Sequence, residues 1–185
     1  MTVHNPRREA LDAATRLYLS QRPIDMSTLA AELGIGRATL YRHVGNRDAL
    51  LADVLAEATE RTYGRAIARA RGAGAARVLD FTEHVLRAVD SSPELRALTA
   101  REPLVFIRLA LMPGTIEDVS TRLTAEVLRC EAESGALRLP LPAETLARAI
   151  VRICDVHLYA PLLGGDAAEI DTALSLVALL LREPG

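Results

Sequence analysis

The sequence has 185 residues, of which half are hydrophobic and a quarter are charged, so it is too apolar for an extended disordered protein. Alanine and leucine, with 31 and 30 residues, favour packed helices, and the longest apolar run, residues 176–181, is far shorter than the roughly 20 residues that span a bilayer. The net charge of −2 excludes a protein that coats nucleic acid by bulk electrostatics, although residues 1–50 carry a net +2 and residues 51–185 a net −4.

The N-terminus and the cysteines predict the cellular compartment. Residues 1–8 are polar and lack the apolar stretch of a secretory signal. Cys130 and Cys154 are too few to form a disulfide framework, and each falls within a helical apolar pattern. We therefore expect a cytoplasmic protein with reduced thiols and no contact with a membrane.

Capping and helix-breaking residues divide the first 70 residues into four helical segments. Asn5 and Pro6 are typical of an N-cap and a first helical residue, and they open a helix that extends to about residue 20. Ser27 is predicted to cap a very short helix that Gly34 ends, and a second short helix follows. Asn46 then caps a longer helix.

The rest of the chain follows the same pattern, and no segment reads convincingly as a β-strand. Pro93 and Pro103 stand at helix starts, where the missing N–H group costs nothing, and Asp166 with Glu169 forms a capping-box pattern before the last helix. We therefore expect an all-α protein. The predicted helices cover residues 6–20, 28–33, 37–43, 47–70, 75–90, 93–101, 103–112, 116–134, 142–163 and 167–182.

Residues 27–44 describe two short helices joined by a tight turn. Ala30 is small where the two helices must approach each other, and Gly34 supplies the backbone freedom that the turn demands. The apolar inside of this unit consists of Leu29, Leu33, Ile35, Leu40 and Val44. Short or cationic side chains remain outside, namely Arg37, Ala38, Thr39, Tyr41, Arg42 and His43. The pattern indicates a helix-turn-helix, whose second helix lies in the major groove of DNA, and the alternative is an ordinary helical hairpin with a basic solvated face.

The wider sequence context favours the helix-turn-helix. Residues 29–30 are an apolar–Ala pair, Gly34 precedes an apolar residue, residues 39–44 read Thr-Leu-Tyr-Arg-His-Val, and Arg47 opens the fourth helix. In this combination the chain resembles the TetR family of bacterial transcriptional regulators, over residues 7–58 in its motifs and over its whole length in helix number and length. It departs from the family pattern at Gly36 (usually Ser or Thr), Val44 (usually aromatic) and Arg47 (usually Lys).

The resemblance implies a division of the chain and a function. Residues 1–50 would form a three-helix helix-turn-helix DNA-binding domain, residues 47–70 a linking helix, and residues 71–185 a helical domain for effector binding and dimerisation. The function implied is that of a ligand-responsive regulator, most commonly a repressor that a small apolar effector releases from a palindromic operator. Residues 138–142 and 158–160 further resemble the QsdR-like subgroup, whose effectors are lactone signals. The alternatives are a DNA-binding regulator without a small-molecule effector and a helical enzyme.

The enzyme alternative would need paired catalytic groups, and the candidates are poor. His84 and His157 are far apart in sequence, and no His or Cys spacing is typical of a metal site. Residues 34–36 read Gly-Ile-Gly and lack both the third glycine and the preceding strand of a dinucleotide loop. We therefore expect no catalysis, no metal and no cofactor.

The resemblance places the effector cavity among the helices expected at 75–90, 103–112 and 116–134. The candidate ligand-binding residues are Phe81, His84, Phe106, Arg108 and Met112. Aromatic and Met side chains at helical spacing are also what a fully packed core contains. Arg108 could instead form a structural ion pair, for example with Glu102 or Glu83.

The last two predicted helices are apolar on more than one side, and such helices need a second surface to cover them. We expect them to form an isologous four-helix interface in a homodimer. The candidate interface residues are Leu146, Ile150, Ile153, Leu158, Leu176 and Leu180. The alternative is that both helices are fully buried within one subunit.

The recognition helix has few side chains with which to read DNA. Arg37 and Arg42 can pair bidentately with guanine edges, and Thr39 and Ala38 are beside them, the latter able to meet a thymine methyl. The predicted phosphate contacts are Tyr41, His43, Arg47, Thr28 and the arm residues Arg7 or Arg8. The alternative is that Arg37 and Arg42 also hold phosphates and that specificity comes from DNA shape.

Overall fold

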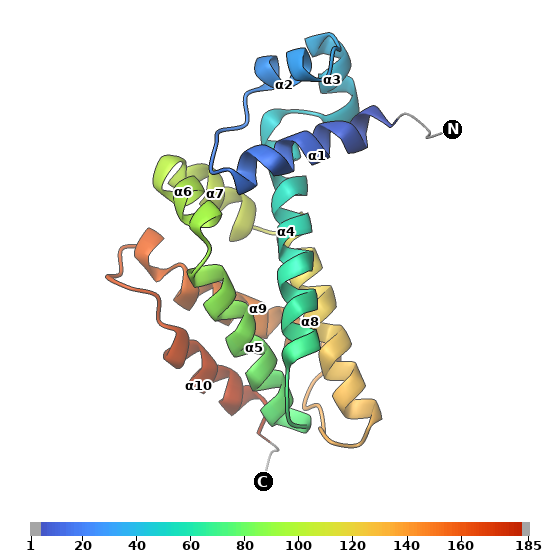
Figure 1. Ribbon diagram of the computed structural model, residues 1–185. Coiled ribbons are helices and arrows are strands. Elements are labelled where there is room, and N and C mark those ends of the chain that lie inside the picture. Colours follow the sequence, from blue (N-terminus) through green and yellow to red (C-terminus); the bar gives the residue numbers. More distant parts are fainter. Residues whose placement is uncertain (1–4, 183–185) are drawn as a thin grey trace.

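The computed structural model describes residues 5–182, and this part of the chain is folded into α-helices with no β-strand (Figure 1). The all-α prediction is confirmed. The helices are α1 (Pro6–Leu19), α2 (Met26–Glu32), α3 (Arg37–Val44), α4 (Arg47–Arg69), α5 (Gly74–Asp90), α6 (Pro93–Arg101), α7 (Pro103–Ala110), α8 (Thr115–Glu133), α9 (Ala143–Leu158) and α10 (Ile170–Leu180), with a 3-10 helix at Ala160–Leu162. None of the helices in residues 5–182 is long and apolar enough to cross a bilayer.

The N-terminal helices gather at one end of α4 (Figure 1). Buried alanines of α1 (Ala10, Ala14) allow close packing against α3 and α4, which contribute Leu40 and Leu50 to the same core. Side chains from α6 and α7, namely Leu98, Phe106 and Ala110, complete this core. The N-terminal unit is therefore packed directly on α6 and α7 as well as being continuous with α4.

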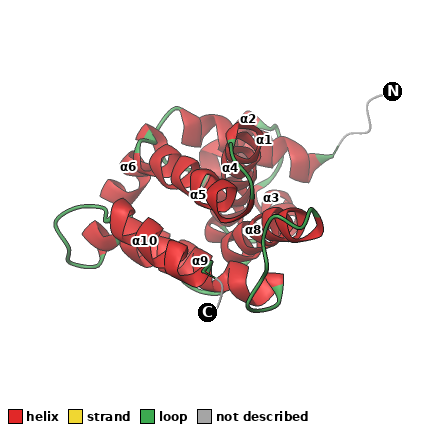
Figure 2. Cartoon of the chain, turned by 90° about the horizontal axis from the view of Figure 1, so that it is seen from below, coloured by secondary structure: helices red, strands yellow, loops and turns green. Residues whose placement is uncertain are grey.

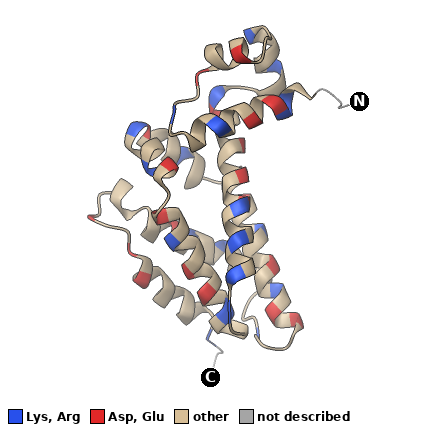
Figure 3. Ribbon diagram, in the orientation of Figure 1, with Lys and Arg blue, Asp and Glu red and all other residues tan. Residues whose placement is uncertain are grey.

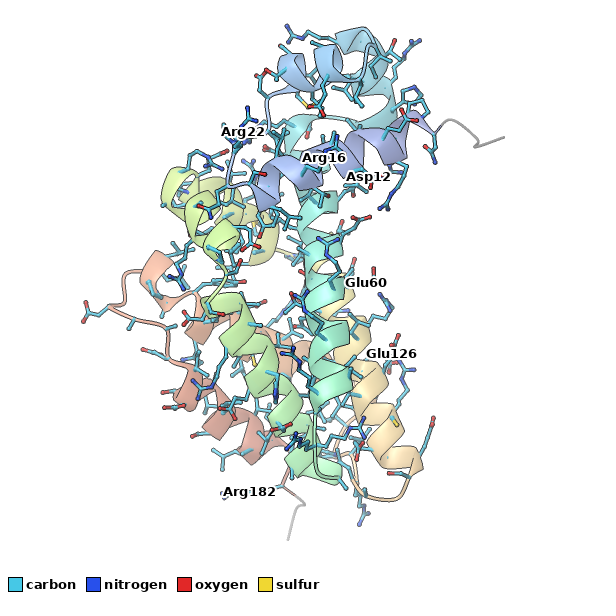
Figure 4. All side chains as sticks on the ribbon, in the orientation of Figure 1. Asp12, Arg16, Arg22, Glu60, Glu126 and Arg182 are labelled. Atoms are coloured by element: carbon cyan, nitrogen blue, oxygen red, sulfur yellow. The ribbon has the colours of Figure 1, made fainter. Side chains whose placement is uncertain are left out.

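The second half of α4 belongs to a bundle with α5, α8, α9 and α10. Its core is built from Val78, Phe81, Leu86, Leu128, Leu146, Ile150 and Val177, all almost fully buried. Viewed along the length of the molecule, α9 and α10 lie side by side at one edge (Figure 2). Glu60 of α4 and Glu126 of α8 lie on the outside of the bundle (Figure 4), and Arg122 of α8 donates hydrogen bonds to them at 2.8 Å and 3.1 Å, respectively. Within residues 5–182, α4 is thus the one helix with fully buried residues in both cores, and the partly buried Ile116 of α8 also packs against the N-terminal core.

The helix starts of the N-terminal unit agree with the predictions at two positions and differ at one. Asn5 and Asn46 accept hydrogen bonds from the backbone N–H groups of Arg8 (3.2 Å) and Ala49 (2.8 Å), as N-caps do. Ser27 does not cap α2: Asp25 does, and its carboxylate accepts from the N–H of Thr28 at 2.7 Å. The helix therefore begins at Met26, whose buried side chain belongs to the N-terminal core.

The end of α9 and the start of α10 were predicted wrongly. α9 stops at Leu158 because Pro161 cannot continue it: a proline ring collides with the carbonyl four residues earlier, here that of His157. That carbonyl accepts instead from the N–H of Glu169 at 2.9 Å. The capping box is also absent from this part of the chain, because the Glu169 carboxylate bonds to Nδ1 of His157 at 2.6 Å and α10 begins without a side-chain cap.

Candidate nucleic-acid interface and internal cavities

The helix-turn-helix has the predicted buried and exposed faces. Leu40 and Val44 of α3 are buried against α1 and α4, whereas Arg37, Ala38, Tyr41, Arg42 and His43 are exposed and Thr39 is half-buried. The N-terminus of α3 has Gly36 in the cap position, and no side chain bonds to its free N–H groups. These N–H groups therefore remain open to an anion.

The two arginines of α3 differ in whether a neighbouring residue fixes the position of the guanidinium. Nη2 of Arg42 donates to the hydroxyl of Thr39 at 3.1 Å, which orients the guanidinium along the exposed face of the helix. Arg37 makes no hydrogen bond and no salt bridge within residues 5–182, although its charge helps to lower the pKa of the exposed Asp25 carboxyl, which is depressed chiefly by the backbone bond from Thr28. Arg37 is thus free to reach a partner.

The predicted phosphate contacts at the edges of the unit are exposed. Thr28 lies in the first turn of α2. Arg7 and Arg8 keep more than half of their side-chain surface exposed while pairing with α4, Arg7 with Asp53 at 2.9 Å and Arg8 with Glu57 at 2.6 Å. Figure 3 shows acidic residues in the part of α4 next to α1 and basic residues farther along it, so the arginines of α1 meet the acidic part of α4.

Arg47 is placed differently from the other predicted phosphate contacts. Its Nε donates to the backbone oxygen of Ile24 at 2.8 Å and its Nη2 to Glu102 at 2.6 Å, so the guanidinium joins the α1–α2 loop, the start of α4 and the α6–α7 junction. It is half-buried and already satisfied. A phosphate contact from Arg47 would require it to leave Glu102, and sequence reasoning gave no sign of this competition.

Two adjoining cavities lie between α4 and the α5–α9 segment. The inner cavity, of about 50 Å³, lies among α4, α5, α8 and α9, and the outer cavity, of about 330 Å³, lies among α1, α4, α5, α6 and α7. Side chains that line both are Thr59, Thr62, Val89, Ala110, Ile116 and Tyr159. Because they share these walls, the two cavities are neighbours along the side of α4.

Only part of the predicted ligand-binding set reaches these cavities. Phe81 lines the inner one, edge-to-face with Tyr63 at 5.6 Å, and Phe106 lines the outer one, edge-to-face with Tyr159 at 5.0 Å. His84, Arg108 and Met112 line neither. These three side chains lie outside both cavities because helical spacing selects a face of a helix without saying whether that face meets a cavity or the solvent.

Arg108 is exposed and forms an ion pair, which is the alternative to a ligand contact, but its partner differs from the two acids suggested. It pairs with Asp48 at the start of α4, and neither Glu102 nor Glu83 is its partner: Glu102 holds Arg47, and Glu83 holds Arg87 at 2.7 Å. Half-exposed His84 hydrogen-bonds through Nδ1 with the backbone oxygen of Asp80 at 2.7 Å, and Met112 is exposed.

Sequence reasoning missed the polar lining of the inner cavity. Tyr63, Ser120, Thr124 and Asp155 all line it. Burial raises the pKa of Asp155 to about 7, and the charge of Glu117 adds to the effect. The available signal was Asp155 itself, an acid within the apolar pattern of α9, but helical spacing does not say that its side chain lines a cavity. No cluster of three or more potential metal ligands occurs within residues 5–182.

The predicted dimer contacts divide into two groups. Leu146, Ile150 and Leu158 are at most 6% exposed and belong to the core of this one subunit, so their assignment to an interface was wrong. Ile153 and Leu180 are half-buried, and Leu176 is exposed. The outer face of the two helices also exposes Val156 and Leu179, each by more than half. Tight packing of α9 on α8 and α10 covers its inner stripe, which periodicity alone did not separate from the outer one.

These features define a class: a helix-turn-helix unit joined by one long helix to an all-helical body with internal cavities. Residues 73–182 match the family model described as tetracyclin repressor-like, C-terminal domain. The structure of the transcriptional repressor QsdR of R. erythropolis, from the TetR family, is similar with 57% identity, 97% coverage of both chains and a TM-score of 0.94. No protein of curated function matches the sequence.

More distant structures share the fold. The TetR family repressor AlkX of Dietzia sp. strain DQ12-45-1b is 23% identical over 95% of this chain and 93% of its own, with a TM-score of 0.64. The TetR family repressor FadR of Thermus thermophilus, in complex with lauroyl-CoA, is 21% identical over 97% of this chain and 99% of its own, with a TM-score of 0.62. The chain belongs to the TetR family, and both the family resemblance and the likeness to QsdR are confirmed.

Proposed function

We propose that the protein is a transcriptional repressor that binds double-stranded operator DNA through α3, as a homodimer in the cytoplasm, and that a small molecule bound in the cavities releases it. The observation that carries the proposal is the exposed face of α3, with free Arg37 and oriented Arg42 above buried Leu40 and Val44. The 57% identity to a TetR family repressor supports repression as opposed to activation.

The proposed reading of DNA divides the exposed side chains into two groups. Arg37 and Arg42 contact guanine edges, because a guanidinium can pair with O6 and N7 together. Tyr41 and His43, with Thr28 and the arm arginines, hold phosphates and fix the register. One α3 offers few contacts, so two of them on a palindromic site are needed for useful affinity at physiological salt.

Replacing Arg37 or Arg42 by alanine should cost about 1–3 kcal/mol of binding free energy on the best operator and relax the base preference at one position. Binding of each variant to operator variants, measured by fluorescence anisotropy at fixed salt, checks this. Arg69→Ala, at the opposite end of α4, is the matched control and should bind as the parent does. Equal losses on every operator variant would mean that Arg37 and Arg42 hold phosphates and that DNA shape supplies the specificity.

The proposed dimer uses the outer faces of α9 and α10. Val156, Leu176 and Leu179 are exposed apolar side chains there, and a two-fold axis would bring each face against its copy in a four-helix arrangement. Apolar faces of this kind favour burial in an obligate interface.

Replacing Val156 or Leu179 by aspartate should convert the dimer to a 20.0 kDa monomer, because each charge would be buried without a partner in the interface. Sedimentation velocity at micromolar concentration measures the result. Leu104→Asp provides the control, since Leu104 is 79% exposed on α7, outside the proposed face, and its variant should remain dimeric. A parent protein that already sediments as a stable monomer contradicts the proposal.

The effector part of the proposal rests on the two cavities and their relation to α4. A ligand can weaken DNA binding only if it binds better to a conformation in which the two α3 helices are misplaced. α4 lines both cavities and continues from α3, and Arg47 ties its start to the α6–α7 junction. The structure of the fold-related FadR in complex with lauroyl-CoA supports the binding of a small molecule by a protein of this fold. The competing candidate is a DNA-binding regulator without an effector.

A further inference from the structure

Arg47 differs from the arm arginines Arg7 and Arg8 in how firmly a carboxylate holds it. Arg7 and Arg8 pair with acids of α4, but more than half of each arginine side chain stays in water. Arg47 is only 28% exposed, and the Glu102 carboxylate, 19% exposed, accepts a hydrogen bond from its Nη2 at 2.6 Å. Water screens an exposed ion pair, which therefore exchanges partners at little cost, whereas a half-buried pair with a short hydrogen bond is held more firmly. Of the three arginines, Arg47 is thus the one whose charge is least available to DNA.

Arg47 nevertheless lies beside the helix proposed to read DNA. Only Gly45 and Asn46 separate the end of α3 from Arg47, the first residue of α4, and Gly45 turns the chain there with φ +73° (Figure 1). The exposed side chain of His43 immediately precedes this turn. Phosphates line both sides of a groove whose base edges a helix reads, so residues at the end of that helix meet them. A guanidinium at this place can bind a phosphate oxygen through the N–H groups that Glu102 engages.

The surroundings of the ion pair allow Glu102 to release Arg47. The neighbouring Arg101 has its Nε 3.5 Å from the same carboxylate oxygen, so Glu102 keeps a cation beside it when Arg47 leaves. The backbone oxygen of Ile24 is bound by Nε of Arg47, a different nitrogen from the one that Glu102 holds, so this bond can persist. Asp48, the other acid that contacts Arg47 within residues 5–182, is 3.4 Å away, farther than Glu102. Exchanging Glu102 for a phosphate therefore leaves no buried charge without a partner.

We propose that Glu102 occupies, in the DNA-free protein, the place of a DNA phosphate at Arg47, and that this intramolecular competition lowers the affinity for the operator. A carboxylate oxygen and a phosphate oxygen have the same chemistry toward a guanidinium, and each N–H can be held by only one of them. Only the molecules that have opened the pair can use Arg47 on DNA, so the pair reduces the apparent affinity. The proposal rests on the DNA-binding function proposed above, and it adds an affinity-determining residue that lies outside the helix-turn-helix unit.

The test uses a duplex that the parent protein selects from a random-sequence pool, with binding measured by fluorescence anisotropy at about 0.15 M salt. Glu102→Gln keeps the size of the side chain but removes its charge. It should tighten binding about three- to tenfold, the range between an exposed ion pair and a half-buried one. Weaker binding by this variant would overturn the proposal, because the ion pair would then help to build the DNA-binding conformation.

Two further variants separate the loss of this contact from the change in net charge. Glu102→Asp keeps the charge but is one methylene shorter, so it should release Arg47 and also tighten binding. Asp53→Asn removes one charge from the first half of α4, where its partner Arg7 is largely exposed, and should change the affinity by less than about twofold. Equal gains in Asp53→Asn and Glu102→Gln, with none in Glu102→Asp, would mean that net charge alone acts and that the proposal is wrong.

A double-mutant cycle identifies Arg47 as the group that is released. In an Arg47→Gln background, Glu102→Gln should change the affinity by less than about twofold, because no guanidinium remains to be freed. In a Glu102→Gln background, Arg47→Gln should reduce the slope of log affinity against log salt concentration by about one phosphate contact. The same gain from Glu102→Gln in both backgrounds would contradict the proposal.

Elution from a heparin column supplies a readout that needs no operator. The sulfates of heparin stand in for phosphates, so the Glu102→Gln protein should elute at higher salt than the parent, and Arg47→Gln should abolish this shift. If the parent selects and binds a duplex but the cycle shows no coupling, the repressor proposal stands and the role of Glu102 is wrong. If no duplex is selected but the heparin shift depends on Arg47, the competition at Arg47 stands and the DNA-binding proposal is wrong.

Discussion

Replacing Gly74 by alanine should lower the free energy of unfolding by more than about 3 kcal/mol. Gly74 opens α5 with φ +60°, a left-handed conformation that side chains other than glycine rarely adopt. A Cβ atom there would lie 2.2 Å from the backbone oxygen of Ala136, in the turn after α8. That oxygen cannot easily retreat, because the N–H groups of Ala136 and Leu137 both donate to the backbone oxygen of Glu131, at 3.1 Å each.

The same turn holds Gly74 by a second bond. The N–H of Gly74 donates to the buried carboxylate of Glu131 at 2.7 Å, so a shift of the backbone to relieve the collision would also break this bond. Loss of a partner by a buried carboxylate adds to the cost. The start of α5 and the end of α8 should therefore loosen together.

Urea denaturation followed by circular dichroism measures the change, and Gly64→Ala is the matched control. Gly64 lies within α4, and a Cβ atom there meets nothing within 4 Å. Because alanine loses less backbone entropy in a helix than glycine does, this variant should be stabilised by about 0.5–1 kcal/mol. If the Gly74→Ala protein were as stable as the parent, the backbone at Ala136 could move aside and the prediction would be wrong.

Local signals predicted most of the fold because capping chemistry acts over a few residues. Asn5 and Asn46 cap helices as expected, and Pro93 and Pro103 open α6 and α7. At α2 both Asp25 and Ser27 could supply the N-cap oxygen. The cap is Asp25, because a helix that starts after it buries Met26. This choice depends on a tertiary contact that the local sequence does not contain.

The sequence predicted the exposed DNA-binding face of the candidate site but not its cavity. Leu40 and Val44 of α3 are buried, so the exposed face of the helix consists of the residues between and beside them, and the sequence predicts that face directly. The cavity does not follow in this way, because its lining combines residues from helices distant in sequence, such as Tyr63 and Asp155. Periodicity predicts that a face is buried, but packing between helices decides whether that face meets a cavity, a core or a second subunit.

Replacing Asp155 by asparagine should raise the free energy of unfolding at about pH 8 by about 2–4 kcal/mol and leave it almost unchanged at about pH 4. The folded protein holds the proton on Asp155 up to a pKa of about 7, whereas the unfolded chain releases it at the ordinary value of 3.8. Between these values the folded state binds more protons, so stability falls as the pH rises, by at most about 4 kcal/mol over the interval. Above about pH 7 both states are ionised and the penalty is constant.

The neutral amide of asparagine has the same shape and pays none of this penalty, so the difference between variant and parent should grow from about pH 4 to about pH 7 and then level off. Denaturant titrations at several pH values measure it, and Asp166→Asn, in the exposed loop before α10, should show no such growth. A difference that does not depend on pH would mean that Asp155 has a partner that stabilises its charge in the folded protein. If the growth is found, the parent carries at neutral pH an acid that weakens its own fold, which is what is expected of a residue kept for binding and not for stability.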